Sequence, residues 1–528
     1  MSAAAFPRGS GLILPISALP NQYGIGTFGE SAYRFVDFLE KAGQSYWQIL
    51  PLSPTGFGDS PYQSCSARAG NPYFIDFDML CAVGILAKED YAFADFGQDP
   101  DSVDYGKVYE HRFPVLRRAY ERGRVAFAGE YKAFCAENAY WLDDYALFMA
   151  IKQRFGMAAL SEWPDEGIRR REQSALITYT NLLAEEMEFQ RFLQWLFFWQ
   201  WSRLKAYAEK KGVGIIGDLP IYVAEDSVEV WAHPELFRLK EPGVPSVCAG
   251  VPPDFYSATG QLWGNPVYDW EHHKKTGYAW WLGRLKAAAE LYDVIRIDHF
   301  RAVHNYWAVP HGETTAEDGH WEPGPGMAFI HAIRQELPHA RFIAEDLGDM
   351  DKETVAFIHS TGFPGMAVAV YAFNPDASSP YLPHNITPAR AAYTSTHDSP
   401  TFVEWLSQEA GDGERAFAFD YMRLRIEEGI GWGVVKSVWG SPACIAVAQM
   451  QDVLGLGADA RMNTPSTLGG RNWRWRIRAE ALNDTVAAML RRVTQIYGRL
   501  PAAKKPAADA PAAETGRENT QQKEKGKL

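Results

Sequence analysis

Cysteine is scarce in this chain of 528 residues. The five cysteines, Cys65, Cys81, Cys135, Cys248 and Cys444, are scattered, odd in number and without CxxC spacing. This pattern argues against a disulfide framework and is typical of thiols in a reducing compartment. Neither the cysteines nor the histidines show the spacing of a zinc site, since the sequence has no HExxH motif. We therefore expect no metal ligands among these residues, and a structural calcium site stays open because scattered carboxylates and carbonyls cannot be assembled into a site from the sequence.

Long hydrophobic runs are also absent. The richest stretch, residues 192–201, is interrupted by Gln194 and Gln200, whereas a transmembrane helix needs about 20 apolar residues. Near the N-terminus, Pro15 and Pro20 break the one candidate for the apolar core of a signal peptide. The sequence therefore predicts a cytoplasmic protein with no membrane partner.

Basic residues are fewer than acidic residues. The chain has 52 Lys and Arg against 65 Asp and Glu, which gives 52 − 65 = −13 with histidine neutral. Nucleic-acid binding needs a clustered basic face, so nucleic acid is not an expected partner. The sequence also contains no GxxxxGK[ST] motif, so it gives no indication of a nucleoside triphosphate.

Aromatic residues, by contrast, are abundant, with 18 Trp, 25 Tyr and 29 Phe. Most such rings pack in cores and interfaces. Residues 254–256, 261–265 and 306–307, however, combine rings with polar groups in expected loops. This mixture suits the binding of sugars, whose C–H faces stack on rings while their hydroxyl groups bind polar side chains.

The middle of the chain alternates helical periodicity with short apolar strands. Parallel strands joined by right-handed helical crossovers form an α/β fold. The predicted helices are residues 30–42, 185–211, 278–291, 327–337, 351–359 and 483–500. The predicted strands are residues 46–50, 213–217, 294–297, 341–344, 366–373, 391–396 and 445–450.

Four of these strands end in a carboxylate, at Asp218, Asp298, Glu345 and Asp398. In a closed (β/α)₈ barrel all strand C-termini face one mouth, so these acids converge there, whereas an open sheet would spread them along an edge. We therefore predict a (β/α)₈ TIM barrel.

The barrel is expected to occupy residues 1–500. Residues 60–185 and 220–275 are too long for ordinary loops, which predicts large helical and loop insertions around the mouth. Residues 501–528 are rich in Ala, Pro and Lys and poor in large apolar side chains, which predicts a disordered tail.

Two of the strand-end acids have the properties that glycoside chemistry requires. A retaining enzyme needs one ionised carboxylate as nucleophile and one protonated carboxyl as acid, about 5 to 5.5 Å apart. Arg296 lies two residues before Asp298 on the same strand face and is expected to favour its ionised form. Glu345 follows an apolar run, and this setting with negative neighbours is expected to raise its pKa.

Two other motifs are given little weight. His397-Asp398 suggests part of a Ser-His-Asp triad with Ser395 or Ser399, but adjacent residues are not expected to hydrogen bond to each other, and GxSxG is absent. A pair that binds sugar hydroxyls fits better. Residues 24–29 match GxGxxG, yet no strand with a terminal acid for a ribose surrounds them, so we predict a tight loop near the barrel mouth and no cofactor.

Several longer motifs occur in order along the chain. They are residues 58–63 (GDSPYQ), 217–222 (GDLPIY), 252–254 (PPD), 261–266 (QLWGNP), 296–301 (RIDHFR), 344–348 (AEDLG), 396–398 (THD) and 461–463 (RMN). With these motifs the sequence resembles the 4-α-glucanotransferases called amylomaltases or disproportionating enzymes, glycoside hydrolase family 77 of the α-amylase clan. The resemblance covers about residues 8–500. It implies transfer of α-1,4-glucan segments from a maltooligosaccharide donor to glucose or a glucan acceptor.

The resemblance also implies roles for individual residues. Asp298 is matched to the nucleophile, Glu345 to the acid and base, and Asp398 to a third carboxylate that binds donor hydroxyls. The residues matched to substrate binding or to support of these acids are Arg296, His397, Tyr62, Asp218, Phe255, Tyr256, Trp263 and Asn265.

The chain departs from the family pattern at three positions. Ser399 stands where many relatives carry Asn, Ala302 where Gly is usual, and Asn374 where an acid is expected. Two other functions remain open beside the leading one. A hydrolase or phosphorylase of the same clan would share the three carboxylates and differ at the acceptor side. A non-catalytic carbohydrate-binding barrel would be expected to lose one of them, and all three are present.

Overall fold

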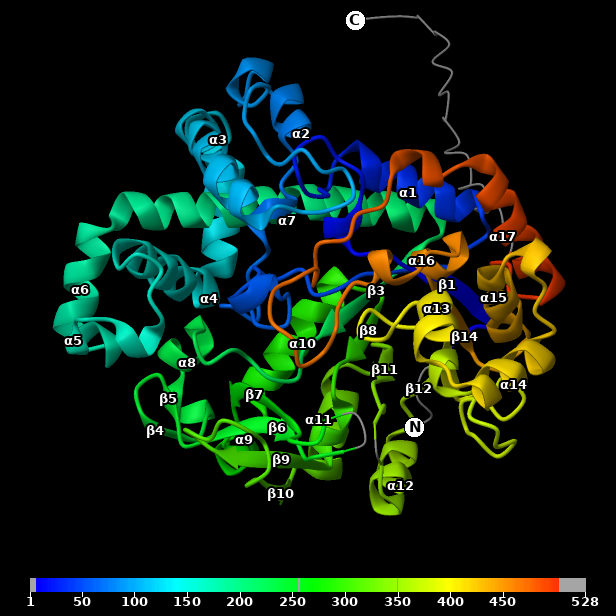
Figure 1. Ribbon diagram of the computed structural model, residues 1–528. Helices are drawn as coiled ribbons and strands as arrows, with labels where there is room; N and C mark the ends of the chain where they lie inside the picture. The colour runs from blue at the N-terminus through cyan, green and yellow to red at the C-terminus, as the bar shows by residue number, and fades with distance from the viewer. Residues whose placement is uncertain (1–5, 255–256, 349, 503–528) are drawn as a thin grey trace, which may run out of the picture.

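A closed barrel of eight parallel strands forms the centre of the computed structural model, which describes residues 6–254, 257–348 and 350–502 (Figure 1). In the order in which they pair, the strands are β1 (Gly9–Ile13), β14 (Ile445–Gln449), β13 (Arg390–Tyr393), β12 (Gly365–Val368), β11 (Phe342–Ala344), β8 (Val294–Ile297), β3 (Gly214–Leu219) and β2 (Tyr46–Gln48). The predicted TIM barrel is confirmed.

Helices follow most of the strands and cover the outside of the barrel. They are α1 (Glu30–Lys41) after β1, α7 (Ala184–Lys211) after β2, α10 (Ala279–Leu291) after β3, α11 (Gly326–Glu336) after β8, α12 (Lys352–Thr361) after β11, α15 (Ile430–Gly440) after β13 and α17 (Asp484–Ile496) after β14. Residues 369–389 between β12 and β13 are all described and contain only a short 3₁₀ helix (Ala369–Tyr371).

Long insertions interrupt the barrel pattern. Between β2 and α7 lie α2 (Phe77–Ala82), α3 (Tyr105–Ala126), α4 (Ala128–Arg154), α5 (Glu166–Arg169) and α6 (Gln173–Leu182). Between β3 and α10 lie α8 (Val228–Ala232), β4 (Leu239–Glu241), β5 (Val244–Pro245), β6 (Val247–Val251), β7 (Gln261–Pro266) and α9 (Trp270–Lys275), and β8 is followed by β9 (Asn305–Pro310) and β10 (His320–Pro323). Near the end come α13 (Phe402–Glu404), α14 (Asp412–Met422) and α16 (Met450–Leu454).

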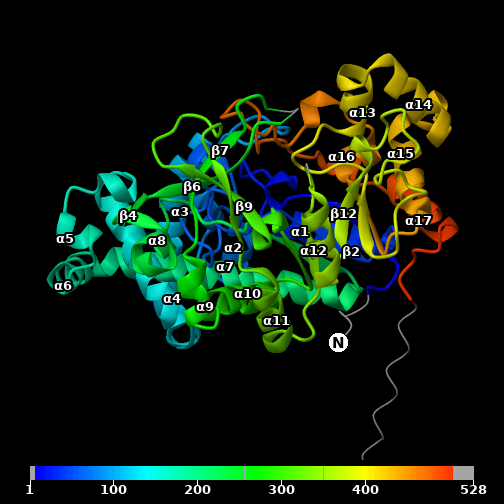
Figure 2. The ribbon, with the colours of Figure 1, turned by 90° about the horizontal axis from the view of Figure 1, so that it is seen from below.

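The insertions give the molecule an elongated outline. Both views place α5 and α6 at one end and α14 and α17 at the other (Figures 1 and 2). Strands of two successive insertions form one four-stranded sheet, in the order β10-β9-β6-β7. Of the helices in the described part of the chain, none is both long and apolar enough to cross a membrane.

The eighth strand of the barrel, β1, was not predicted from the sequence. Its sequence, Gly-Ser-Gly-Leu-Ile, has few of the branched and aromatic residues that mark strands. Gly11 is needed because a Cβ atom there would lie 2.7 Å from the backbone oxygen of Tyr46 on the neighbouring strand. The close approach of β1 and β2 thus requires glycine, and glycine is a residue type that does not indicate a strand in the sequence.

Other boundaries also differ from those expected. The strand predicted at residues 366–373 ends at Val368, and the chain then turns into the 3₁₀ helix. The GxGxxG segment lies in the loop between β1 and α1, on the side of the barrel at which the strands end. The predicted disordered tail lies, from residue 503 onward, outside the described residues.

Candidate active site

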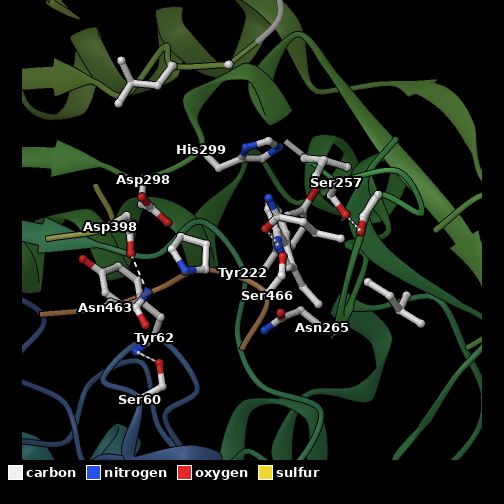
Figure 3. Close-up of a pocket in the computed structure, with 18 of the residues that line it drawn as sticks. Ser60, Tyr62, Tyr222, Ser257, Asn265, Asp298, His299, Asp398, Asn463 and Ser466 are labelled. Carbon is white, nitrogen blue, oxygen red and sulfur yellow. Dashed lines mark hydrogen bonds between the residues drawn. The ribbon is translucent and has the colours of Figure 1, made fainter. Parts of the chain in front are cut away.

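A cavity of about 1100 Å³ opens where the barrel strands end. This exceeds the volume of most small-molecule pockets, which reach about 1000 Å³, and suits a ligand of several sugar units. Of the predicted site residues, those that line the cavity are Tyr62, Trp263, Asn265, Arg296, Asp298, Glu345 and Asp398. Figure 3 shows Asp298 and Asp398 close together beside Tyr62. Phe255 and Tyr256 lie outside the described residues.

Arg296 joins two of the strand-end acids. It lies on β8, and its Nη1 atom is 2.9 Å from Oδ1 of Asp298 and 2.7 Å from both carboxylate oxygens of Asp218 on β3. The side chains of Arg296 and Asp218 are 3% and 0% exposed, so water does not screen this ion pair. One buried cation therefore fixes the orientation of Asp298 and stabilises its negative charge.

Tyr62 links Asp218 to the His397-Asp398 segment. Its hydroxyl group donates to Oδ2 of Asp218 at 2.9 Å and lies 2.7 Å from Nε2 of His397. The two rings are stacked, with centroids 5.3 Å apart and planes inclined by 12°. Tyr62 comes from the insertion after β2, so the insertion supplies a part of the site that no barrel strand could provide.

Asp398 is held by two polar side chains. Its Oδ2 atom lies 3.0 Å from Nε2 of His397, and its Oδ1 atom accepts a hydrogen bond of 2.7 Å from Nδ2 of Asn463 (Figure 3). Burial opposes ionisation of this carboxyl, but His397 and Asn463 outweigh it and lower the pKa of Asp398 to about 2. Asp398 is therefore a carboxylate at neutral pH.

The expectation that adjacent His397 and Asp398 do not hydrogen bond to each other is wrong. The turn after β13 brings the imidazole and the carboxylate to 3.0 Å. No serine completes a triad, however, because the hydroxyl of Ser395 donates to Asp452 and that of Ser399 donates to backbone oxygens of its own turn. These contacts argue against Ser395 or Ser399 as a nucleophile.

Glu345 is oriented by backbone groups. It follows β11, and its Oε2 and Oε1 atoms accept hydrogen bonds from the amide groups of His299 at 2.7 Å and Leu347 at 2.8 Å. Burial, followed by the negative charge of Asp298, raises the pKa of Glu345 to about 7. Glu345 is thus able to hold or release a proton near neutral pH, unlike the ionised Asp398.

His299 and Asn463 are site residues that the sequence analysis did not single out. His299 has a positive φ of 47°, an uncommon conformation for a residue with a side chain, and this bend points its amide at Glu345. Its ring meets Trp263 edge to face, with centroids 4.7 Å apart. Asn463 follows α16 in an irregular loop, where no periodicity signals a function.

Trp263 and Asn265 reach the cavity from β7. The amide of Asn265 donates to the backbone oxygen of Val223 at 2.8 Å and accepts from Gln63 at 3.2 Å. Gln63 also donates to the backbone oxygen of Trp263 at 3.3 Å. These contacts tie the insertion that carries Tyr62 to β7, so both aromatic residues are held against the barrel mouth.

A fully buried carboxylate anchors the segment that carries Asp398. Asp452 on α16 is 0% exposed and accepts hydrogen bonds from the hydroxyl groups of Thr394 and Ser395 and from the amide of Phe402 at 2.7 Å. Gln449 adds a bond of 2.7 Å to the backbone oxygen of Thr396. Both ends of the His397-Asp398 turn are thereby fixed to the next strand and helix of the barrel.

Replacing Asp452 with alanine is expected to lower the free energy of unfolding by about 3 kcal/mol, because three buried donors lose a charged acceptor. Urea unfolding checks this value. Asp459→Ala is the matched control, since Asp459 is 92% exposed and its surface ion pair with Arg471 contributes about 0 to 1 kcal/mol. Equal losses in the two variants would contradict the anchoring role of Asp452.

The three departures from the family pattern have different surroundings. Ser399 is buried, and its hydroxyl accepts from the amide of Thr396 at 2.8 Å, which closes the turn around His397 and Asp398. Ala302 is buried in a 3₁₀ helix (Phe300–Val303) beneath the site. Asn374 is exposed and is not among the residues that line the cavity.

Metal ligands do not gather in the described residues, where no three His, Cys, Asp or Glu side chains are placed to hold an ion. The cationic side chains that line the cavity are Arg296 and Arg301, and both are bonded to carboxylates. The arrangement therefore brings together in one cavity a carboxylate bonded to an arginine, a carboxyl group that holds a proton near neutral pH and a third, ionised carboxylate.

Known proteins are similar to this chain along most of its length. The family model for 4-alpha-glucanotransferase matches residues 14–482. A 4-alpha-glucanotransferase from Clostridium butyricum is 47% identical over 485 residues, which cover 92% of this chain and 99% of that protein. The structure of an amylomaltase from Streptococcus agalactiae in complex with acarbose superposes with a TM-score of 0.91 at 43% identity, covering 94% of this chain and all of that one. The chain therefore belongs to the 4-alpha-glucanotransferase family.

Proposed function

We propose that this protein transfers α-1,4-glucan segments from a donor chain to the 4-hydroxyl group of a glucan or glucose acceptor, by two displacements with retention of configuration. The observation that carries the proposal is the convergence of Asp298, Glu345 and Asp398 in one cavity, each with different partners. Glu345, with a pKa of about 7, can supply a proton, and Asp298, bonded to Arg296, is placed as the nucleophile, which are the two roles that a retaining mechanism requires.

In the first displacement, Asp298 attacks the anomeric carbon of the donor. The bond between this carbon and the glycosidic oxygen breaks while Glu345 gives its proton to that oxygen. The products are a glucosyl ester on Asp298, a glucan with a free 4-hydroxyl group, and ionised Glu345. Arg296, at 2.9 Å, holds the attacking carboxylate and keeps its charge available until the bond forms.

In the second displacement, Glu345 acts as a base. It takes the proton of the acceptor's 4-hydroxyl group as that oxygen bonds to the anomeric carbon and the ester bond to Asp298 breaks. Both carboxyl groups then return to their starting states. The amides of His299 and Leu347 keep the Glu345 oxygens in place through both steps.

The remaining predicted residues have supporting roles in the proposal. Asp398, ionised and held by His397 and Asn463, binds hydroxyl groups of the donor sugar. Tyr62 offers a ring face to that sugar, and Asp218 keeps Arg296 in position. Trp263 and Asn265 form part of the cavity wall. For Phe255 and Tyr256, contact with the glucan chain stays a prediction from the resemblance.

Donor and acceptor specificity also stays a prediction. The amylomaltase from Streptococcus agalactiae was solved with acarbose, an oligosaccharide analogue, which supports a maltooligosaccharide as the ligand of this cavity. The cytoplasmic location predicted from the sequence likewise stays a prediction.

A phosphorylase is disfavoured by the charges in the cavity. Such an enzyme needs a cationic position for inorganic phosphate beside the anomeric carbon. Arg296 is bonded to Asp218 and Asp298, and Arg301 is bonded to Asp351. Both guanidinium groups that line the cavity are therefore already paired with carboxylates. A hydrolase would use the same three carboxylates, and only the products separate it from a transferase.

Incubation of the purified protein with maltotriose tests the proposal. Transfer is expected to yield glucose together with a ladder of longer maltooligosaccharides, while the total concentration of reducing ends stays constant. An increase in reducing ends without longer products would establish hydrolysis and overturn the proposal. Addition of phosphate gives a further comparison, because glucose 1-phosphate would appear only with a phosphorylase.

A further inference from the structure

One tryptophan on the cavity wall has no role in the reaction described above. Trp321 lies on β10, the edge strand of the sheet β10-β9-β6-β7, and it is 41% exposed. It lines the same cavity as the three carboxylates. An exposed indole ring in a sugar-binding cavity is chemically suited to stack on a glucose ring.

Trp321 is held rigidly by its neighbours. The guanidinium carbon of Arg301 lies 3.9 Å from the centre of its ring, and Trp307 meets it edge to face, with centroids 5.2 Å apart. Arg301 itself is only 8% exposed and is bonded to Asp351 at 3.0 Å and to Asn305 at 2.9 Å. The ring is therefore fixed on one side, and the remaining surface is exposed in the cavity.

The sheet register places Trp321 in one row with Leu262 on β7. Trp321 is opposite Trp307, Trp307 is opposite Gly250, and Gly250 is opposite Leu262 on β7. Residues directly opposite one another share a face of the sheet, and Leu262 also lines the cavity. The row from β7 to β10 thus begins and ends at residues that line the cavity, Leu262 and Trp321.

Trp321 and Trp263 lie on the two opposite edge strands of this sheet. Trp263 on β7 contacts His299, the residue after Asp298, which places β7 beside the reacting carbon. Strands in a sheet are about 4.8 Å apart, so β10 lies three spacings or roughly 14 Å from β7. Only an oligosaccharide of several units spans this distance.

Polar groups next to Trp321 complete a sugar-binding surface. The hydroxyl residues Thr314 and Thr315 and the carboxylate of Asp351 also line this cavity, and Asp351 is bonded to Arg301, which stacks on Trp321. We propose that Trp321 is a stacking platform for glucose units remote from the bond that is cut, so that it determines the preference for long glucan chains. This inference rests on the proposed function and adds a specificity-determining residue to it.

The test compares kcat/KM for maltotriose and maltoheptaose in wild type, Trp321→Ala, Trp321→Phe and the control Phe93→Ala, whose side chain is 91% exposed outside the cavity lining. Trp321→Ala is expected to lower kcat/KM for maltoheptaose about tenfold and that for maltotriose less than twofold, since stacking on one ring is worth roughly this factor. Trp321→Phe keeps a smaller aromatic face, so its kcat/KM for maltoheptaose is expected to lie between those of the wild type and Trp321→Ala. Equal losses for the two substrates would overturn the proposal.

A binding measurement separates this inference from the proposed function. Calorimetric titration of maltoheptaose into Asp298→Asn and into the double variant Asp298→Asn/Trp321→Ala measures binding without turnover, and the dissociation constant is expected to rise five- to tenfold when Trp321 is removed. An unchanged dissociation constant would overturn the platform even if transfer is observed. A raised constant without any transfer products would support the platform and overturn the proposed function alone.

Discussion

Replacing Asp298 with asparagine is expected to lower turnover of maltotriose by at least about 10⁴-fold. An amide is too weak a nucleophile to attack the anomeric carbon, and asparagine nearly matches aspartate in size, so the fold should persist. The hydrogen bond from Arg296 can pass to the amide oxygen, which keeps this part of the site in place. Turnover is measured as the initial rate of ladder formation, with the unfolding midpoint in urea recorded in parallel.

The control for this variant is Asp99→Asn, the same chemical change at an exposed acid far from the cavity lining. It should leave both the rate and the urea midpoint unchanged. A rate for Asp298→Asn within tenfold of wild type would contradict covalent catalysis by this residue. A large drop in its urea midpoint would instead indicate that the buried pair of Arg296 and Asp218 depends on the charge of Asp298.

The rate of transfer is expected to fall as pH rises through about 7. Burial and the charge of Asp298 raise the pKa of Glu345 to about 7, and the first displacement needs its protonated form. Below this pKa the acid is present in most molecules. Above it, the fraction falls tenfold for each pH unit. The measurement is kcat/KM for maltotriose between pH 5 and 9.

Glu345→Gln is expected to remove this alkaline limb and to lower kcat/KM for maltotriose by about 10² to 10⁴-fold. A donor with a good leaving group, such as α-maltosyl fluoride, needs little protonation and should lose much less of its first-step rate. Equal losses for both donors would contradict the assignment of Glu345 as the acid. Persistence of the alkaline limb in Glu345→Gln would assign that limb to another group.

The fold could be predicted well where the pattern is local. Alternating helices and apolar strands indicated the α/β class, and four strand-end acids favoured a closed barrel over an open sheet. The strand β1 was missed because its glycines serve contacts with another strand. Such contacts join residues far apart in the chain, and no local periodicity records them.

For the site, the sequence predicted which acids gather but not how each is held. Arg296 lies on β8 and Asp298 directly follows that strand, so their contact could be expected from the spacing of two residues. Asn463, which bonds to Asp398, is 65 residues away from it in the chain. Asp452 on α16 anchors the segment that carries Asp398. His299 adopts a positive φ, a conformation that residue type alone does not reveal.

The sequence by itself therefore determined the barrel, the three carboxylates at its mouth and the family likeness, because strand ends and residue identities are local properties. Tertiary structure decided the chemical state of each acid. Glu345 is buried beside another carboxylate and has a pKa of about 7, whereas Asp398 contacts His397 and Asn463 and has a pKa of about 2. The pKa of a carboxyl depends on burial and on charges brought near by folding, and these distances exist only once the chain is packed.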